Sequence, residues 1–307
     1  MLDILATHSL LGMQIHISLL LASSLLACAD DAATPEPNLL ALPGQAYYPE
    51  SLSAAADGTL FVGSLATGEV VAFDPGATEA RTVIASGQHG VTGVTGVHVE
   101  GDELWLCSVD TTFQRPTEVR SFTLAGAPLD TFALAPTQFC NDLAFDGDTL
   151  YATDSFSGAI LRLDPGATEL ATHLQDERFV PDSQGAFGLD GIAFAGDTLY
   201  VNKLDTGELF AIAADESIAQ VAVTLQGPDG MRALDDGALL VIEGAGRLTR
   251  IDLATETATP IAEGLDMPTG VVLARGSAWV TEGQLGRLFA MPPVDPNLPF
   301  AVRRIDL

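Results

Sequence analysis

Apolar residues along the chain occur in short runs that are separated by turn-forming residues, and this arrangement repeats. Each of six segments begins with a polar residue and a short apolar strand, continues through a turn into a second apolar strand, and usually adds a third. Tight turns such as Asp57-Gly58 and Asp236-Gly237 separate the first strand from the second, as β-hairpins require. The six segments start at Glu50, Thr95, Asn141, Asp190, Asp229 and Thr269.

The spacing of these segments, 39 to 49 residues from one to the next, indicates the fold. Second strands are expected at 60–64, 104–108, 150–154, 199–203, 239–243 and 278–282, and third strands at 70–74, 160–164, 209–212, 248–252 and 288–291. Repeats of this length with several strands each are typical of propeller blades. We therefore expect an all-β fold, a six-bladed β-propeller of four-stranded antiparallel blades over residues 46–307. Residues 300–307 would complete the sixth blade, and residues near 39–42 would add closure.

The first 28 residues differ from the rest of the chain. Residues 17–27 are apolar and uncharged and precede Cys28. The run is shorter than the roughly 20 residues that span a bilayer, so residues 1–28 are predicted to be a signal peptide. Leu25-Leu26-Ala27-Cys28 resembles a bacterial lipobox, which implies lipidation of Cys28 and an exported protein anchored at the cell envelope. A plain cleaved signal or a buried segment is the alternative, because no Lys or Arg precedes the run.

The polar, proline-containing residues 29–45 are expected to form a flexible tether. The net charge of −28 comes from 41 acidic and 13 basic residues. Such a surface repels phosphate backbones, so we expect no nucleic-acid partner, and membrane contact only through the anchor. The acidity is compatible with divalent cations, although it also serves solubility alone. The oligomeric state stays open.

The polar residues that start the six first strands are the candidate site. In a propeller the innermost strands line a central channel, so their starts meet at one mouth. Three carboxylates, one amide and two hydroxyls form an oxygen-rich set of the kind that hard cations such as Ca²⁺ prefer. Alternatively, these residues only start strands, since Asp-Gly and Asn-Asp are common in turns.

Two further groups of residues are expected near the same mouth. Lys203, the only lysine, would hold a substrate anion or form an ion pair with Glu243. Cys107 and Cys140 would either form a disulfide, which exported proteins favour, or remain two small buried side chains. Lys203 belongs to the group at the ends of the second strands, whose members are Ser64, Ser108, Asp154, Lys203, Glu243 and Glu282.

Pro228-Asp229-Gly230-Met231 and the following Asp235-Asp236-Gly237 turn resemble a motif of the gluconolactonase/regucalcin-like family. The resemblance spans about residues 47–300 and implies a six-bladed propeller with one divalent cation at the channel mouth. It implies that Glu50 and Asp229 are metal ligands. Asp190 stands where the family has an asparagine ligand, and Asn141 stands where an asparagine binds substrate.

The same resemblance implies a metal-dependent hydrolase of lactones or related esters. Asp229 or Asp190 would act as the catalytic proton acceptor, while Thr95 and Lys203 would join Asn141 in binding substrate. The sequence contains no Gly-x-Ser-x-Gly motif of a serine hydrolase. The alternative is a non-catalytic, lipid-anchored propeller that binds a protein, a glycan or a small ligand, since propellers host many functions.

Overall fold

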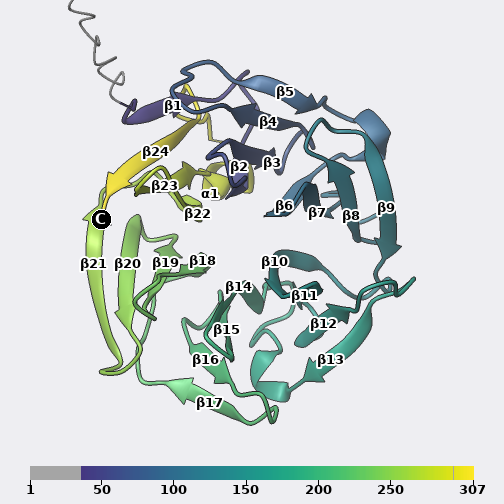
Figure 1. Cartoon of the computed structure of the whole chain (residues 1–307), viewed down its shortest axis with the longest axis vertical. Helices are drawn as coiled ribbons and strands as arrows, with labels where there is room; N and C mark the ends of the chain where they lie inside the picture. The colour runs from purple at the N-terminus through teal and green to yellow at the C-terminus, as the bar shows by residue number, and fades with distance from the viewer. Residues whose placement is uncertain (1–35, 293) are drawn as a thin grey trace, which may run out of the picture. The chain divides into compact units, whose positions relative to one another are not determined.

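Six four-stranded antiparallel sheets stand around a central channel, which confirms the predicted six-bladed β-propeller (Figure 1). The computed structural model describes residues 36–292 and 294–307, and the predicted signal peptide with Cys28 lies outside them. In that described part, no helix is long and apolar enough to cross a membrane.

Each blade runs from an innermost strand at the channel to an outermost strand at the rim (Figure 1). Blade 1 contains β2 (Pro49–Ala54), β3 (Leu60–Ser64), β4 (Val70–Phe73) and β5 (Arg81–Ile84). Blade 2 contains β6 (Val94–Glu100), β7 (Glu103–Ser108), β8 (Glu118–Thr123) and β9 (Pro128–Ala133). Blade 3 contains β10 (Cys140–Asp146), β11 (Thr149–Asp154), β12 (Ala159–Leu163) and β13 (Ala171–Gln175).

Blades 4 and 5 have the same order. Blade 4 contains β14 (Leu189–Ala195), β15 (Thr198–Lys203), β16 (Leu209–Ile212) and β17 (Ile218–Val221). Blade 5 contains β18 (Pro228–Ala233), β19 (Leu239–Glu243), β20 (Arg247–Asp252) and β21 (Thr257–Glu263). Short helical turns lie at η1 (Gln88–Gly90), η2 (Glu177–Phe179) and α1 (Leu285–Leu288).

Blade 6 closes the ring by combining both ends of the described chain. It contains β22 (Pro268–Ala274), β23 (Ser277–Glu282), β24 (Ala301–Asp306) and, outermost, β1 (Leu39–Ala41). Strand β1 lies within the stretch predicted as a tether, so the propeller extends back to it. The third strand predicted at 288–291 is wrong: Leu288 ends α1, and β24 takes that place in the sheet.

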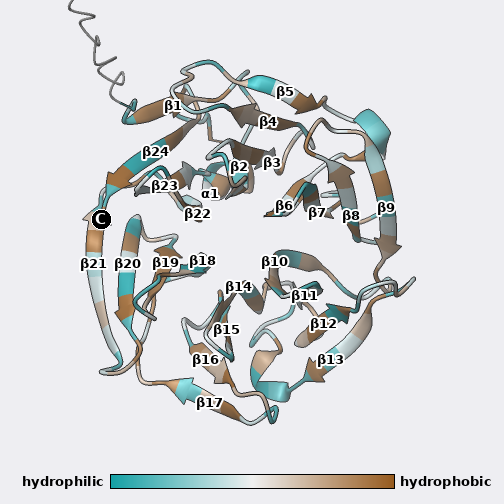
Figure 2. Cartoon of the chain, in the orientation of Figure 1, coloured by the Kyte–Doolittle hydropathy of each residue, from teal (hydrophilic) through white to brown (hydrophobic). Residues whose placement is uncertain are grey.

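The core lies between neighbouring blades rather than within them. Phe61 and Val70 of blade 1, for example, pack against Val97 and Leu106 of blade 2, and burial of this apolar area stabilises the fold. Figure 2 shows hydrophobic stretches on β3 and β4 of blade 1, while the third strands β20 and β24 carry hydrophilic ones. The outermost strand β9 is almost entirely exposed.

Candidate functional site

The six residues that were predicted to start the innermost strands are the second residue of each strand, and they meet at one mouth of the channel. All of them line a single cavity with a volume of ≈ 790 Å³. We call them the channel ring, and they come one from each blade: Glu50, Thr95, Asn141, Asp190, Asp229 and Thr269. The predicted convergence is therefore present in the structure.

A β-bulge at the same place in every blade exposes the ring residue to the channel. In blade 1, Pro49 pairs with Ser64, and the register shifts before Leu52 pairs with Val62. The same shift occurs in the other five blades. Because a bulge leaves residues unpaired and re-aims their side chains, Glu50 and its counterparts point away from the ladder.

Glycines that follow ring residues allow neighbouring inner strands to approach closely. A Cβ on Gly191 would lie 2.3 Å from the carbonyl oxygen of Asp229, and one on Gly96 would lie 2.8 Å from that of Asn141. Gly230 has the same relation to Thr269, at 2.9 Å. A side chain at these positions would push the blades apart, so the spacing of the ring depends on them.

Polar side chains on the second strands hold the backbone of the carboxylate ring residues. Thr153 Oγ1 donates to the carbonyl of Asp190 at 2.6 Å, and Asn202 Nδ2 donates to that of Asp229 at 2.6 Å. Thr281 Oγ1 donates to the carbonyl of Glu50 at 3.3 Å. Sequence reasoning missed these three residues. A signal for them was present in the sequence: each is a polar residue at the fourth position of a predicted second strand whose first three residues are largely apolar.

The carboxylates of the ring destabilise one another's charge. Burial, followed by the charges of Asp229, Asp190 and Asp142, raises the pKa of Glu50 well above its usual range. Burial and the Asp142 charge raise the pKa of Asp190 to about 7, despite its hydrogen bonds. Burial and the charge of Asp190 also raise the pKa of Asp229. A cation or retained protons would relieve this repulsion.

The uncharged ring residues connect blades. Asn141 Nδ2 donates to Asp190 Oδ2 at 2.8 Å and to Ser155 Oγ at 3.1 Å. Thr95 Oγ1 donates to the carbonyl of Cys140 at 2.9 Å, and Thr269 Oγ1 donates to that of Pro49 at 3.1 Å. Asn141 therefore holds Asp190 in place, while the two threonine hydroxyls serve mainly to join neighbouring inner strands.

Asp142 and Arg232 form a buried ion pair at the ring. Arg232 Nη1 lies 3.2 Å from Asp142 Oδ2, and their side chains are 16% and 6% exposed. Sequence reasoning missed this pair. Arg232 also lines a smaller cavity of ≈ 330 Å³, together with residues further along the inner strands such as Phe145 and Phe194. The pair thus lies between the ring and that second cavity.

Lys203 is not brought to the cavity. Its ammonium group forms ion pairs with Asp182 and, at 3.7 Å, with Asp205, and its side chain is 4% exposed. The suggested pair with Glu243 is wrong, since Glu243 binds Arg247 at 2.6 Å instead. Lys203 is absent from the residues that line the cavity, so a direct contact with substrate has no support in this arrangement.

Cys107 and Cys140 are joined in a disulfide, with Cα atoms 5.5 Å apart. The bond connects β7 of blade 2 to β10 of blade 3, directly before ring residue Asn141. It therefore fixes the two blades to each other beside the site, and it settles the alternative that the sequence left open.

The donor set at the ring fits a hard divalent cation in its chemistry. Glu50, Asp190 and Asp229 supply carboxylate oxygens, and Asn141 supplies an amide oxygen, the ligand types that Ca²⁺ takes. The repulsion between the carboxylates favours a cation at the same place. The side chains do not form a ready-made cluster, however: within 36–292 and 294–307, no three acidic, histidine or cysteine side chains are placed to hold one ion. Cation binding would need these side chains to come closer to one another.

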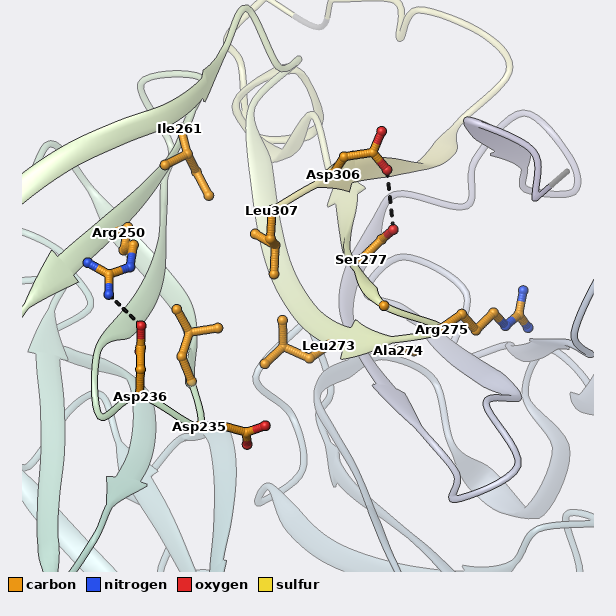
Figure 3. Close-up of a pocket in the computed structure, with 12 residues that line it drawn as sticks. Asp235, Asp236, Arg250, Ile261, Leu273, Ala274, Arg275, Ser277, Asp306 and Leu307 are labelled. Atoms are coloured by element: carbon orange, nitrogen blue, oxygen red, sulfur yellow. Dashed lines mark hydrogen bonds and ion pairs between the residues drawn. The ribbon is translucent and has the colours of Figure 1, made fainter.

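A second hollow of comparable volume, ≈ 720 Å³, lies between blades 5 and 6 away from the ring. Figure 3 shows that Arg250 and Asp236 of blade 5 face each other across this hollow, with Arg250 Nη2 2.7 Å from Asp236 Oδ2. Both groups are already paired, and the ring residues do not line this hollow. The ring cavity therefore offers the richer chemistry.

Comparisons with known proteins show the fold. No protein-family model matches the sequence, and no curated protein matches it. A gluconolactonase from Xanthomonas campestris is 17% identical, with 87% of this chain and 89% of that chain covered and a TM-score of 0.66. A luciferin-regenerating enzyme is 13% identical, with 88% and 95% covered and a TM-score of 0.63. Virginiamycin B lyase from Staphylococcus aureus is 14% identical, with 88% and 98% covered and a TM-score of 0.60. The chain is thus similar in fold to propellers that include enzymes.

Proposed function

We propose that the ring cavity is the active site of a divalent-metal-dependent hydrolase of lactones or related esters. The observation that carries the proposal is the convergence of Glu50, Asp190 and Asp229 with Asn141 on one cavity. A gluconolactonase and a luciferin-regenerating enzyme among the proteins of similar fold support this class of reaction. The cation most suited to such oxygen ligands at an exported protein is Ca²⁺.

Glu50, Asp190 and Asp229 would hold the cation, and each would have to lose its proton to do so. The cation would supply Lewis acidity toward the substrate carbonyl and toward the charge that develops on its oxygen. Asn141 holds Asp190 Oδ2 through its amide at 2.8 Å, so it orients that carboxylate. In a lactone complex, the same amide would be available to the substrate oxygen if Asp190 turned to the cation.

A general base is needed to take a proton from the attacking water. Asp190 is suited to this role by its position, because it lines the cavity and its carboxylate is held by the Asn141 amide at 2.8 Å. Asp229 lies beside it, and burial together with the charge of Asp190 raises the pKa of Asp229. Either carboxylate, deprotonated when the cation binds, would take up the proton of the attacking water.

We also propose that residues 1–28 export the protein and that Cys28 anchors it by a lipid at the cell envelope. Metabolic labelling with a radioactive fatty acid tests this: the wild type should be labelled, and Cys28→Ser should not. Label in the variant would contradict the proposal.

The second candidate function, a non-catalytic binding module, is favoured by one observation. The described side chains do not form a three-residue metal cluster as they stand. A module that binds a ligand through its cavity would need neither the cation nor a general base. Propellers of this kind exist in many functional contexts.

Calcium titration by calorimetry on the wild type and on Asp229→Asn distinguishes the two functions. The hydrolase predicts saturable one-site binding that the variant loses, together with calcium-dependent hydrolysis in a lactone and ester panel. Asp236→Asn is the matched control, because Asp236 is an exposed carboxylate paired with Arg250 outside the cavity. Absence of binding, with melting insensitive to calcium, would overturn the hydrolase and leave the binding module.

A further inference from the structure

The walls of the ring cavity differ in chemistry from the ring itself. Four phenylalanines line one part of the cavity, and they belong to the segments between strands of blades 2 and 3 and to the segment before β14 of blade 4: Phe113, Phe139, Phe156 and Phe187. Apolar side chains at blade 6 line another part: Met267, Leu285 and Phe289. The charged groups are thus gathered at the ring, while the walls are largely apolar.

The phenylalanines form a contiguous aromatic wall. Phe139 lies 5.1 Å from Phe156 and 5.1 Å from Phe187 between ring centroids, and Phe156 lies 5.3 Å from Phe187. These separations are typical of interacting aromatic pairs. Phe139 immediately precedes β10, two residues before Asn141. The wall therefore begins directly next to the ring.

Two aromatic side chains in the cavity lining are largely exposed. Phe113 is 59% exposed and Phe289 is 60% exposed, so neither is needed to complete the core. Phe113 also has a φ of 53°, a left-handed conformation that is rare for a bulky residue and that concentrates at ligand sites. Exposed apolar groups beside a concave site indicate a ligand that covers them.

Polar partners for a sugar-like ligand are few along the walls. Among the described residues that line the cavity, Thr111 is the one polar side chain outside the ring. Within the ring, the hydroxyls of Thr95 and Thr269 already donate to backbone carbonyls. A polyhydroxylated ligand would leave several of its hydroxyl groups without partners after losing water, which opposes its binding.

We propose that the cavity takes a lactone or ester that carries an aryl or alkyl group of five or more carbons. The carbonyl end lies at the ring, which rests on the proposed function, and the apolar group lies between the aromatic wall and Phe289. The volume of ≈ 790 Å³ is in the range of pockets that hold drug-sized ligands. The substrate class is therefore an apolar carbonyl compound rather than a sugar lactone.

Binding of non-hydrolysable lactams to the full chain in calcium buffer tests the ligand class without requiring turnover. The probes are a δ-lactam with a pentyl substituent, the unsubstituted δ-lactam and gluconolactam, each titrated by calorimetry. We expect the pentyl lactam to bind on the order of 30-fold more tightly than the unsubstituted one, because each fully buried methylene contributes about fourfold and about half of the chain is covered. Gluconolactam should bind no better than the unsubstituted lactam.

Substitutions in the cavity wall test where the apolar group of the ligand binds. Phe156→Ala should reduce the preference for the pentyl lactam about tenfold and leave the unsubstituted lactam unchanged. Phe289→Ala, at an exposed position, should act in the same direction and does not depend on core packing. Phe194→Ala is the matched control, because Phe194 lines the smaller cavity, and it should change neither affinity.

The outcomes separate the ligand class from the reaction. Equal affinity for the pentyl and unsubstituted lactams, or tighter binding of gluconolactam, would overturn the ligand class even if lactones are hydrolysed. Preferential binding of the pentyl lactam without hydrolysis of any pentyl lactone would support the ligand class and overturn the proposed hydrolase. Hydrolysis of pentyl δ-lactone at a higher kcat/KM than glucono-δ-lactone would support both.

Discussion

Arg232 reaches Asp142 although a third inner strand stands between theirs. Arg232 belongs to β18 of blade 5 and Asp142 to β10 of blade 3, and Nη1 lies 3.2 Å from Oδ2. The charge of Asp142 raises the pKa of Glu50, Asp190 and Asp229. Arg232 thus places a positive charge at a cluster of four carboxylates, where it limits their repulsion.

Replacement of Arg232 by Met should destabilise the protein without added metal. Asp142 would be left buried and unpaired beside three other carboxylates, and loss of one partner of a buried pair costs about 3–5 kcal/mol in unfolding free energy. Urea unfolding at pH 7.5 (roughly physiological conditions, where carboxylates are normally ionised) measures the change. Arg250→Met, which removes an exposed pair with Asp236, is the control and should cost under about 1 kcal/mol.

The double variant Asp142→Asn/Arg232→Met should recover much of that loss, because no buried charge is then left without a partner. Strictly additive effects of the two substitutions would show that the ion pair does not couple them.

The stability of the metal-free protein should fall as pH rises toward neutrality and beyond. The pKa of Asp190 is raised to about 7 in the folded state, so the folded protein binds more protons than the unfolded chain between about pH 4 and 7. Unfolding free energy therefore decreases with pH in this window. Because the raised pKa values of Glu50 and Asp229 act in the same direction, Asp190→Asn should reduce the slope without abolishing it.

Thermal melting of the wild type and Asp190→Asn at pH 5.5, 6.5 and 7.5 (about the range over which a group with this pKa titrates) checks the prediction. Identical slopes for the two proteins would show that Asp190 does not retain its proton in the folded state.

Gly191→Ala should disturb the ring through the backbone. Its Cβ would lie 2.3 Å from the carbonyl oxygen of Asp229 and 2.7 Å from Asn202 Nδ2, so β14 and β18 must separate. We expect a loss of roughly 1–3 kcal/mol in unfolding free energy, the usual range for overpacking. Gly244→Ala is matched to it, since the nearest atom would be 3.4 Å away, and it should be close to neutral. Equal losses in both variants would rule out the close approach as the cause.

Removal of the disulfide should destabilise the fold while leaving its architecture intact. Cys107 and Cys140 are 33 residues apart, and closing a loop of that length in the unfolded chain is worth roughly 3–4 kcal/mol in the loop-entropy account. Guanidinium unfolding of Cys107→Ala/Cys140→Ala against the oxidised wild type measures the loss. Addition of reductant should lower the stability of the wild type only, and a similar response from the variant would contradict the assignment.

The fold was predictable because each repeat places the same kind of residue at the same point of the blade. A polar residue, an apolar strand and a turn recur six times, and such a pattern is consistent with one architecture. The ring residues followed from the same alignment. The third strand of blade 6 was mispredicted at 288–291 because a short apolar run is compatible with a strand as well as with a helical turn. The true third strand, β24, begins only at Ala301.

The parts of the site that escaped prediction depend on geometry that no local pattern reveals. Asp142 follows Asn141, and in a regular strand their side chains would point to opposite faces. The bulge suspends that alternation and allows both residues to contact other inner strands. The aromatic wall comes from segments outside the regular strands, so its members share no sequence spacing. Only the packed blades bring Phe113, Phe156 and Phe187 together.

The contacts between a glycine of one inner strand and the backbone carbonyl of the next have a consequence for how the ring residues can change in evolution. They involve backbone atoms and Gly96, Gly191 and Gly230, not the side chains of the ring residues themselves. A ring position can therefore exchange one polar side chain for another while its backbone stays where the neighbouring blades hold it. Asp190 occupies such a position, so new chemistry can arise in this scaffold by a single substitution that leaves the surrounding backbone in place.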